Sequence, residues 1–120
     1  MISISQHIGY RAEKRACRFL KKQGLSLITK NFQTPYGEID LIMQDQQEIV
    51  FVEVRYRQNT DFGTASEPVS SMKQRRIVKS SLAYLMKHQI PDSFPCRIDV
   101  VDITKNDAIC WIKNAFDVEY

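Results

Sequence analysis

Two strand-like segments joined by a short polar loop constrain the fold of this chain more than any other feature. Residues 39–44 and 49–57 are rich in β-branched and aliphatic side chains, and the four polar residues between them predict an antiparallel hairpin. Pairing across that loop places Asp40 directly opposite Glu53. Opposed Cβ atoms lie about 5 Å apart, so the two carboxylates would repel each other unless a cation or a proton lies between them.

This pair of acids predicts a metal site. Carboxylate oxygens at such a spacing suit Mg²⁺ or Mn²⁺, which bind through one or two carboxylates together with phosphate oxygens and water. Nothing in the sequence indicates zinc, because His7 and His88 lie far from each other and from any cysteine pair. The same hairpin register places Arg55 opposite Glu38, as an ordinary cross-strand ion pair.

An amphipathic helix is predicted over residues 5–23, with Gly24 as its C-terminal cap. Glu13 lies within the apolar stripe of this helix, among small residues that would let the helix approach the sheet closely. Glu13 therefore either forms a salt bridge with a basic residue or reaches toward the acids of the hairpin. The opposite side of the helix gathers six basic residues: Arg11, Lys14, Arg15, Arg18, Lys21 and Lys22.

The remaining pattern predicts a second helix and three more strands. Ser71 and Gln74 form a predicted capping box that opens a helix to about residue 88. Its inward side chains are expected to be Val78, Leu82, Leu85 and Met86. Strands are expected at 25–32, 97–103 and 108–112, a turn at 34–37 and a polar loop at 58–68. The order αβββαββ indicates a single α/β domain over residues 1–120.

Composition narrows the class of protein. The net charge of +3 is unevenly spread: residues 1–91 hold 14 Lys and Arg against 8 Asp and Glu, whereas residues 92–120 hold 3 against 6. A local basic surface suits phosphate groups, although a solvated basic face is the commoner cause. Three cysteines without a C-x-x-C pair indicate a reducing compartment, and hence the cytoplasm. The longest aliphatic or aromatic run, four residues, predicts neither a membrane span nor a secretion signal.

Two sequence blocks around the acids carry a family resemblance. Asp40, followed after twelve residues by Glu53-Val54-Arg55, resembles the D…(E)xK signature of the restriction-endonuclease-like nucleases. The chain is also similar to the YraN family of small bacterial proteins, and the blocks G-E-I-D-L-I and F-V-E-V are the specific part of that pattern. The matched positions are Gly9, Glu13, Ala16, Gly24, Asn31, residues 37–42, residues 50–55, Arg57, Lys73, residues 97–101 and residues 111–116.

The resemblance implies a restriction-endonuclease-like core, a mixed β-sheet flanked by helices, and a likeness to archaeal Holliday junction resolvases. In those enzymes a glutamate of the first helix, a hairpin aspartate and an E-x-K pair form the metal site. Carried over, these are Glu13, Asp40, Glu53 and Arg55. Arg55 departs from the pattern, in which lysine is usual, because arginine supplies charge but stays protonated and cannot act as a base. Lys73 is then either the missing ammonium or one member of a solvated basic run.

The expected function is the hydrolysis of DNA backbone phosphates by a metal-dependent nuclease. Mg²⁺ or Mn²⁺ would be held by Asp40, Glu53, Glu13 and the backbone carbonyl of Val54. Arg55 and Lys73 would stabilise negative charge on the phosphate. Expected contacts to flanking phosphates come from Arg11, Lys14, Arg15, Arg18, Arg57, Lys73 and Arg76. A junction-cutting activity would favour a homodimer.

Other interpretations stay open at this point. One is a nucleic-acid-binding module that keeps the nuclease fold without turnover, which an ion pair between Arg55 and Glu38 would support. Another is a scaffold that binds a protein through the acidic C-terminal part. Asp99 and Asp102 are placed outside the site, because the sequence assigns them no partner. The sequence distinguishes neither DNA from RNA nor linear from branched substrates.

Overall fold

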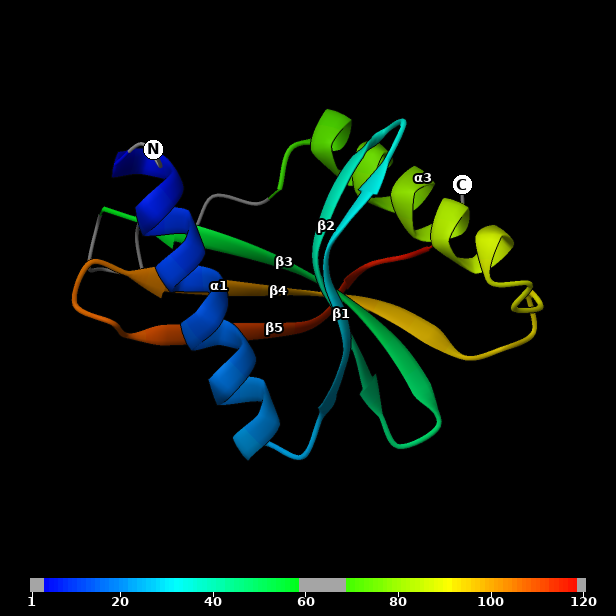
Figure 1. Cartoon of the computed structure of the whole chain (residues 1–120), viewed down its shortest axis with the longest axis horizontal. Coiled ribbons are helices and arrows are strands. Elements are labelled where there is room, and N and C mark those ends of the chain that lie inside the picture. The colour runs from blue at the N-terminus through cyan, green and yellow to red at the C-terminus, as the bar shows by residue number, and fades with distance from the viewer. Residues whose placement is uncertain (1–3, 59–68, 119–120) are drawn as a thin grey trace.

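The described residues form a five-stranded sheet with one helix on each face (Figure 1). The structure is a computed structural model that describes residues 4–58 and 69–118, with side chains from residue 7 onward in the first helix. The elements are α1 (Ile4–Lys22), β1 (Ser26–Thr34), β2 (Gly37–Asp45), β3 (Glu48–Arg57), α3 (Ser71–Lys87), β4 (Cys96–Thr104) and β5 (Ile109–Phe116). The strands lie in sequence order across the sheet, with β3 and β4 parallel and the other neighbours antiparallel. The described elements follow the predicted order αβββαββ, and the α/β class is confirmed.

Each face of the sheet carries its own apolar cluster. On one face, Ala12, Ala16 and Leu20 of α1 pack against side chains that include Val50 and Val52 of β3. Small side chains at the first two of these positions let α1 lie close to the sheet, as their spacing predicts. In Figure 1, α1 passes in front of β3, β4 and β5, and α3 lies at the upper right, next to β2.

The other face of the sheet is covered by α3. Ile77, Val78, Tyr84 and Leu85 of this helix belong to a cluster built around Phe51 of β3. The helix is also the crossover between β3 and β4, because two parallel neighbours cannot be joined by a tight turn. The start of α3 is therefore brought close to the end of β3.

The β2–β3 hairpin has the predicted register. Asp45 pairs with Glu48 at its tip, and the ladder continues to Leu41 opposite Val52. The paired ladder ends there, one position before Asp40. The two acids that the sequence places opposite each other thus lie just beyond the regular hairpin.

The alternation of side chains between the two faces of the sheet is interrupted in β2 at Asp40. Ile39 belongs to the cluster under α3, whereas Leu41, two residues later, belongs to the cluster under α1. Residues two apart on a regular strand share a face, so the strand is irregular between them. On the neighbouring strand Asn31 has a positive φ of 53°. Such irregularities change the direction in which a side chain points, and here Asp40 is left outside the regular pairing of β2 with β3.

Three local predictions need correction in α3. The N-cap is Ser70 and not Ser71: the Ser70 hydroxyl accepts a hydrogen bond from the amide of Lys73. The side chain of Gln74 donates to the carbonyl of Val69, so it does not close the predicted capping box. Met86, predicted to face inward, is 80% exposed, and the buried position next to Leu85 is Tyr84.

Other boundaries differ by a few residues. Strand β5 continues to Phe116, beyond the predicted end at residue 112. Gly24 caps α1 as predicted: it has a φ of +103°, and the amide of Leu25 donates to the carbonyl of Leu20. Most of the predicted polar loop at 58–68 lies outside the described residues. Neither described helix combines the length and the apolar character that a membrane crossing requires.

Candidate functional site

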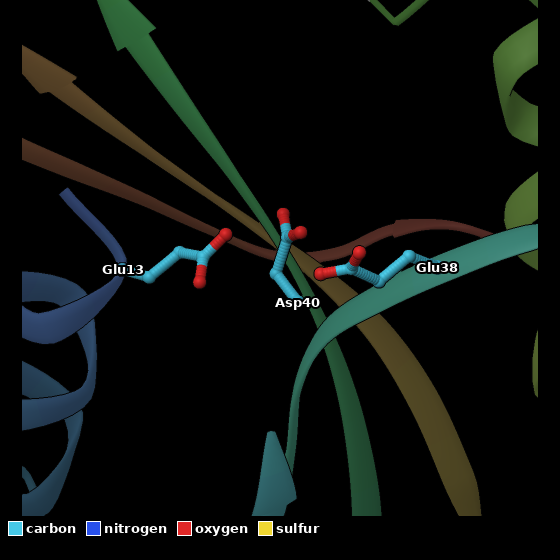
Figure 2. A group of neighbouring side chains, drawn as sticks. All are labelled: Glu13, Glu38 and Asp40. Atoms are coloured by element: carbon cyan, nitrogen blue, oxygen red, sulfur yellow. The ribbon is translucent and has the colours of Figure 1, made fainter. Parts of the chain in front are cut away.

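Three carboxylates meet between α1 and the irregular part of β2 (Figure 2). Glu13 comes from α1, while Glu38 and Asp40 come from β2, and one oxygen of each lies within 4.8 Å of the others. Figure 2 shows the three side chains converging from the helix and the strand. We call these three residues the acidic cluster. None of the ion pairs formed within the described ranges involves any of them.

Asn31 holds the two glutamates of the acidic cluster together. Its side-chain amide donates to Glu13 Oε1 at 2.9 Å and to Glu38 Oε1 at 2.6 Å. Gln33 donates to the second oxygen of Glu38 at 2.8 Å. The positive φ of Asn31, a conformation that asparagine tolerates better than most residues, accompanies this arrangement. Glu38 was not predicted as a ligand from the sequence, although its position two residues before Asp40 was a signal.

Asp40 is the most perturbed acid. One of its oxygens accepts the backbone amide of Val54 at 2.8 Å, which replaces a regular ladder contact. Burial, followed by the negative charge of Glu53, raises the pKa of Asp40 to about 8. Burial is also the main cause that raises the pKa of Glu13, with the charges of Glu38 and Glu53 adding to it. Among the described residues, no cation forms an ion pair with Asp40 or Glu13 that would favour their ionised forms.

Glu53 lies beside the acidic cluster and faces α3. Its neighbours Val52 and Val54 pack under α1, so Glu53 leaves β3 on the opposite side. There it forms an ion pair of 2.8 Å with Lys73 of α3. The side chain of Glu53 is nearly buried, whereas that of Lys73 is half exposed. Lys73 therefore reaches the site from the helix that follows β3.

Arg55 pairs with Asp102, and among the described residues no ion pair joins it to Glu38, so the ion pair that would support a binding module without turnover is not formed there. Its guanidinium donates two hydrogen bonds to the carboxylate of Asp102, at 2.7 and 2.9 Å. The reason is the parallel β3–β4 pairing, which places these two residues in register. Asp102 is fully buried, and Arg57 also approaches it, at 3.8 Å. A hollow of about 470 Å³ between the end of β3 and the start of α3 is lined by Arg55, Arg57 and Lys73.

The other basic residues fall into separate surfaces. Lys14 and Arg18 line a groove between α1 and β1, together with Glu13. Arg11 and Arg15 lie on another side of α1, and Arg15 forms an ion pair of 3.4 Å with Asp107. Arg76 is exposed on α3. The predicted phosphate contacts are therefore not one continuous stripe.

Asp99 has a structural environment away from the acidic cluster. It accepts hydrogen bonds from Arg97, from the indole of Trp111 and from the amide of Asn114. Arg97 also pairs with Asp45 and Glu48 at the tip of the hairpin. The prediction that Asp99 lies outside the candidate site agrees with these contacts, whereas Asp102 adjoins the site through Arg55.

The fold and the acids together define a small α/β protein with an acidic cluster between its first helix and its central hairpin. The model of a family described as "Uncharacterised protein family UPF0102" matches residues 12–103. The chain belongs to the UPF0102 family, which is the YraN family indicated by its sequence blocks.

Relatives cover almost the whole chain. A UPF0102 protein of Coxiella burnetii (strain RSA 331 / Henzerling II) is 56% identical over 120 residues, which is 100% of both chains. A UPF0102 protein of Legionella pneumophila (strain Philadelphia 1) is 43% identical over 115 residues, 95% of this chain and 98% of the relative. One of Nitrosomonas eutropha is 43% identical over 116 residues, 97% of this chain and 98% of the relative.

Proposed function

We propose that this protein is a metal-dependent nuclease that hydrolyses phosphodiester bonds of DNA, built on a restriction-endonuclease-like fold. The observation that carries the proposal is the acidic cluster, which gathers Glu13, Glu38 and Asp40 within 4.8 Å and forms no ion pair with the cations of the described residues. Lys73 and Arg55 are positively charged residues near these acids. Lys73 pairs with Glu53, which lies beside the acidic cluster, and Arg55 follows Glu53 by two residues on β3. Phosphodiester hydrolysis requires that the reacting phosphate be positioned and its negative charge stabilised. Carboxylates that can hold a metal ion, with positively charged side chains beside them, meet this requirement.

The acidic cluster fits Mg²⁺ or Mn²⁺ on the chemistry of its donors. All of its side-chain donors are carboxylate oxygens, which are the ligands that these hard cations prefer. The pKa of Asp40 is raised by burial and then by the negative charge of Glu53, and a bound cation would offset both causes by stabilising the ionised carboxylate. Asp40, Glu13 and Glu38 would hold the cation, with Glu53 and the carbonyl of Val54 as further candidates. A bound divalent cation would stabilise charge on a phosphate and promote ionisation of water.

The neighbouring residues have distinct roles in this proposal. Asn31 orients the two glutamates through its amide hydrogens, and the amide of Val54 orients Asp40. Lys73 and Arg55 bind the nonbridging oxygens of the phosphate and stabilise the added charge that develops there. Neither of the two is expected to act as a base, since arginine stays protonated and Lys73 is held by Glu53.

The resemblance of the D…(E)xK pattern to that of junction resolvases, which is an expectation from the sequence, leads us to extend the proposal to branched DNA. A resolvase cuts two strands that are related by symmetry, so this variant of the proposal needs two copies of the site in a homodimer. Substrate preference is therefore measured together with the oligomeric state.

The test is a cleavage assay on the purified protein. Labelled linear, single-stranded, flapped and branched DNA are incubated with Mg²⁺, with Mn²⁺ or with EDTA. We expect metal-dependent cleavage by the wild type, none by Asp40→Asn, and unchanged cleavage by the control Asp92→Asn, which removes an exposed acid far from the site. Cleavage that persists in Asp40→Asn would assign the activity to another site or another protein. Binding of DNA without cleavage of any form would refute the enzyme and leave a binding module.

A further inference from the structure

A groove between α1 and β1 includes one residue of the acidic cluster in its lining. Its volume is about 420 Å³, and its walls come from one side of α1, from β1 and from Leu41 of β2. Glu13 and its hydrogen-bond partner Asn31 both line it, so the groove adjoins the cluster. The groove is separate from the hollow that Arg55 and Lys73 line, so it can contact a different part of a bound molecule.

Both walls of the groove carry positive charge. Lys14, Arg18 and Lys21 follow one another along one side of α1 at helical spacing, and Lys30 extends from β1. Among the described residues, Glu13 supplies the one carboxylate in the lining, and it already accepts a hydrogen bond from Asn31. Four cations arranged around a concavity differ from a solvated convex face, because they can converge on one anionic chain.

An exposed aromatic ring lies at the same groove. Tyr10 precedes Lys14 by one helical turn, and 54% of its surface is exposed. The ammonium of Lys30 lies 5.9 Å from the centre of its ring. A large exposed ring next to cations is typical of sites at which a nucleobase stacks while neighbouring cations contact the phosphates.

We propose that this groove binds a single strand of DNA and directs it toward the acidic cluster. Lys14, Arg18, Lys21 and Lys30 contact successive phosphates, and Tyr10 stacks with a base. The inference deepens the proposed nuclease function, since it names the form of the substrate and its path, but strand binding itself requires no cleavage. A single strand is favoured over a duplex because the volume is that of a small-ligand pocket and both walls can reach one backbone.

The three native cysteines provide a direct test. Cys17 lines the groove, whereas Cys96 lies in a hollow at the C-terminal side of α3 and Cys110 lies on β5. The wild type is alkylated in EDTA, where no metal-dependent cleavage occurs, and the rate at each cysteine is measured by mass spectrometry with and without an oligonucleotide. We expect single-stranded DNA to slow the alkylation of Cys17 several-fold and to leave the other two rates unchanged.

The same measurement contains the refuting results. Equal protection of all three cysteines, or none at Cys17, would overturn the groove as a strand site. Equal protection of Cys17 by duplex DNA at the same phosphate concentration would overturn the preference for a single strand. Stronger protection by RNA of the same sequence would overturn the assignment to DNA. Because cleavage is absent throughout, none of these results depends on the nuclease activity itself.

Matched variants separate the groove from general charge. Lys14→Gln with Arg18→Gln removes two groove cations, and the control Lys87→Gln with Arg75→Gln removes one lysine and one arginine that are exposed on α3, outside the groove lining. The groove pair should lower the slope of log K against log salt by about 1.4, at ~0.7 per phosphate contact on a single strand. The control pair should leave the slope nearly unchanged, and equal losses in both would refute the groove.

The stacking contact is tested by two substitutions of Tyr10. Tyr10→Leu should weaken binding of single-stranded DNA roughly tenfold or more, whereas Tyr10→Phe should retain it, because the base stacks on the ring and not on the hydroxyl. Since the ring is exposed, neither change is expected to unfold the protein. Equal affinity of the two variants would exclude stacking on Tyr10.

Discussion

Replacing Asp40 by Asn should stabilise the metal-free protein at neutral pH. Asparagine has nearly the same shape, and its carbonyl oxygen can still accept the amide of Val54. It needs no proton, however, whereas Asp40 must be protonated or remain as an unfavourable charge next to Glu53 and Glu13. The substitution therefore removes a cost of folding that only the wild type has.

The size of this cost follows from the pKa of Asp40. Its value is about 8 in the folded protein, against 3.8 for an ordinary aspartate. A carboxyl with a raised folded pKa contributes stability that is fully present below the unfolded pKa and is lost as the pH rises through the folded value. Each pH unit in that window costs about 1.4 kcal/mol, so from 3.8 to pH 7 the cost is roughly 4 kcal/mol. We expect a gain of about 2–4 kcal/mol for the variant at pH 7, since relaxation of neighbouring acids offsets part of the cost.

The assay is unfolding by urea at several pH values between 5 and 8 in EDTA. The free energy of unfolding should fall more steeply with pH for the wild type than for Asp40→Asn, with a difference approaching about 1.4 kcal/mol per pH unit. The control Asp92→Asn should follow the wild type, because this acid is exposed. Parallel curves for the wild type and Asp40→Asn, or a less stable Asp40→Asn at pH 7, would refute the reasoning.

Three further results are expected. Mg²⁺ or Mn²⁺ should raise the melting temperature of the wild type but not of Asp40→Asn, because a ligand stabilises only the state that binds it; equal shifts in thermal scans would exclude a site built on Asp40. Arg55→Ala should abolish cleavage but spare DNA binding, while Arg55→Lys should retain activity. If Arg55→Ala lost both DNA binding in a gel-shift assay and cleavage, the result would contradict a role in charge stabilisation. Met86→Ser should change the free energy of unfolding by less than about 0.5 kcal/mol, whereas Tyr84→Ala should cost about 3–5 kcal/mol, and the reverse order in urea would contradict their burial.

Features that depend on nearby residues could be predicted from the sequence. The hairpin register followed from the length of the loop between Asp45 and Glu48, which leaves few ways to pair the strands. The close approach of α1 followed from small residues such as Ala12 and Ala16 on its apolar face. Even so, the N-cap was misplaced by one position, because consecutive serines at 70 and 71 carry the same signal.

Features that depend on distant or irregular backbone could not be predicted. Arg55 and Asp102 are 47 residues apart, and only the parallel pairing of their strands brings them together. Glu38 joins the acidic cluster because Asn31 adopts a positive φ and the alternation of side chains in β2 is interrupted at Asp40. Propensity and periodicity describe regular elements, so they do not indicate where a strand departs from regularity.

The order in which the candidate site assembles during folding follows from the parallel pairing of β3 with β4. Glu38 and Asp40 belong to a hairpin, whose closure involves residues close together in the chain, so they are positioned early. Arg55 meets its carboxylate partner only after α3 has crossed the sheet and β4 has docked, and contacts at this separation form slowly. During refolding, the two acids of β2 are therefore positioned before the cations beside them are fixed. The proposed cleavage activity should accordingly return with the slowest kinetic phase, after most of the helical signal has been recovered.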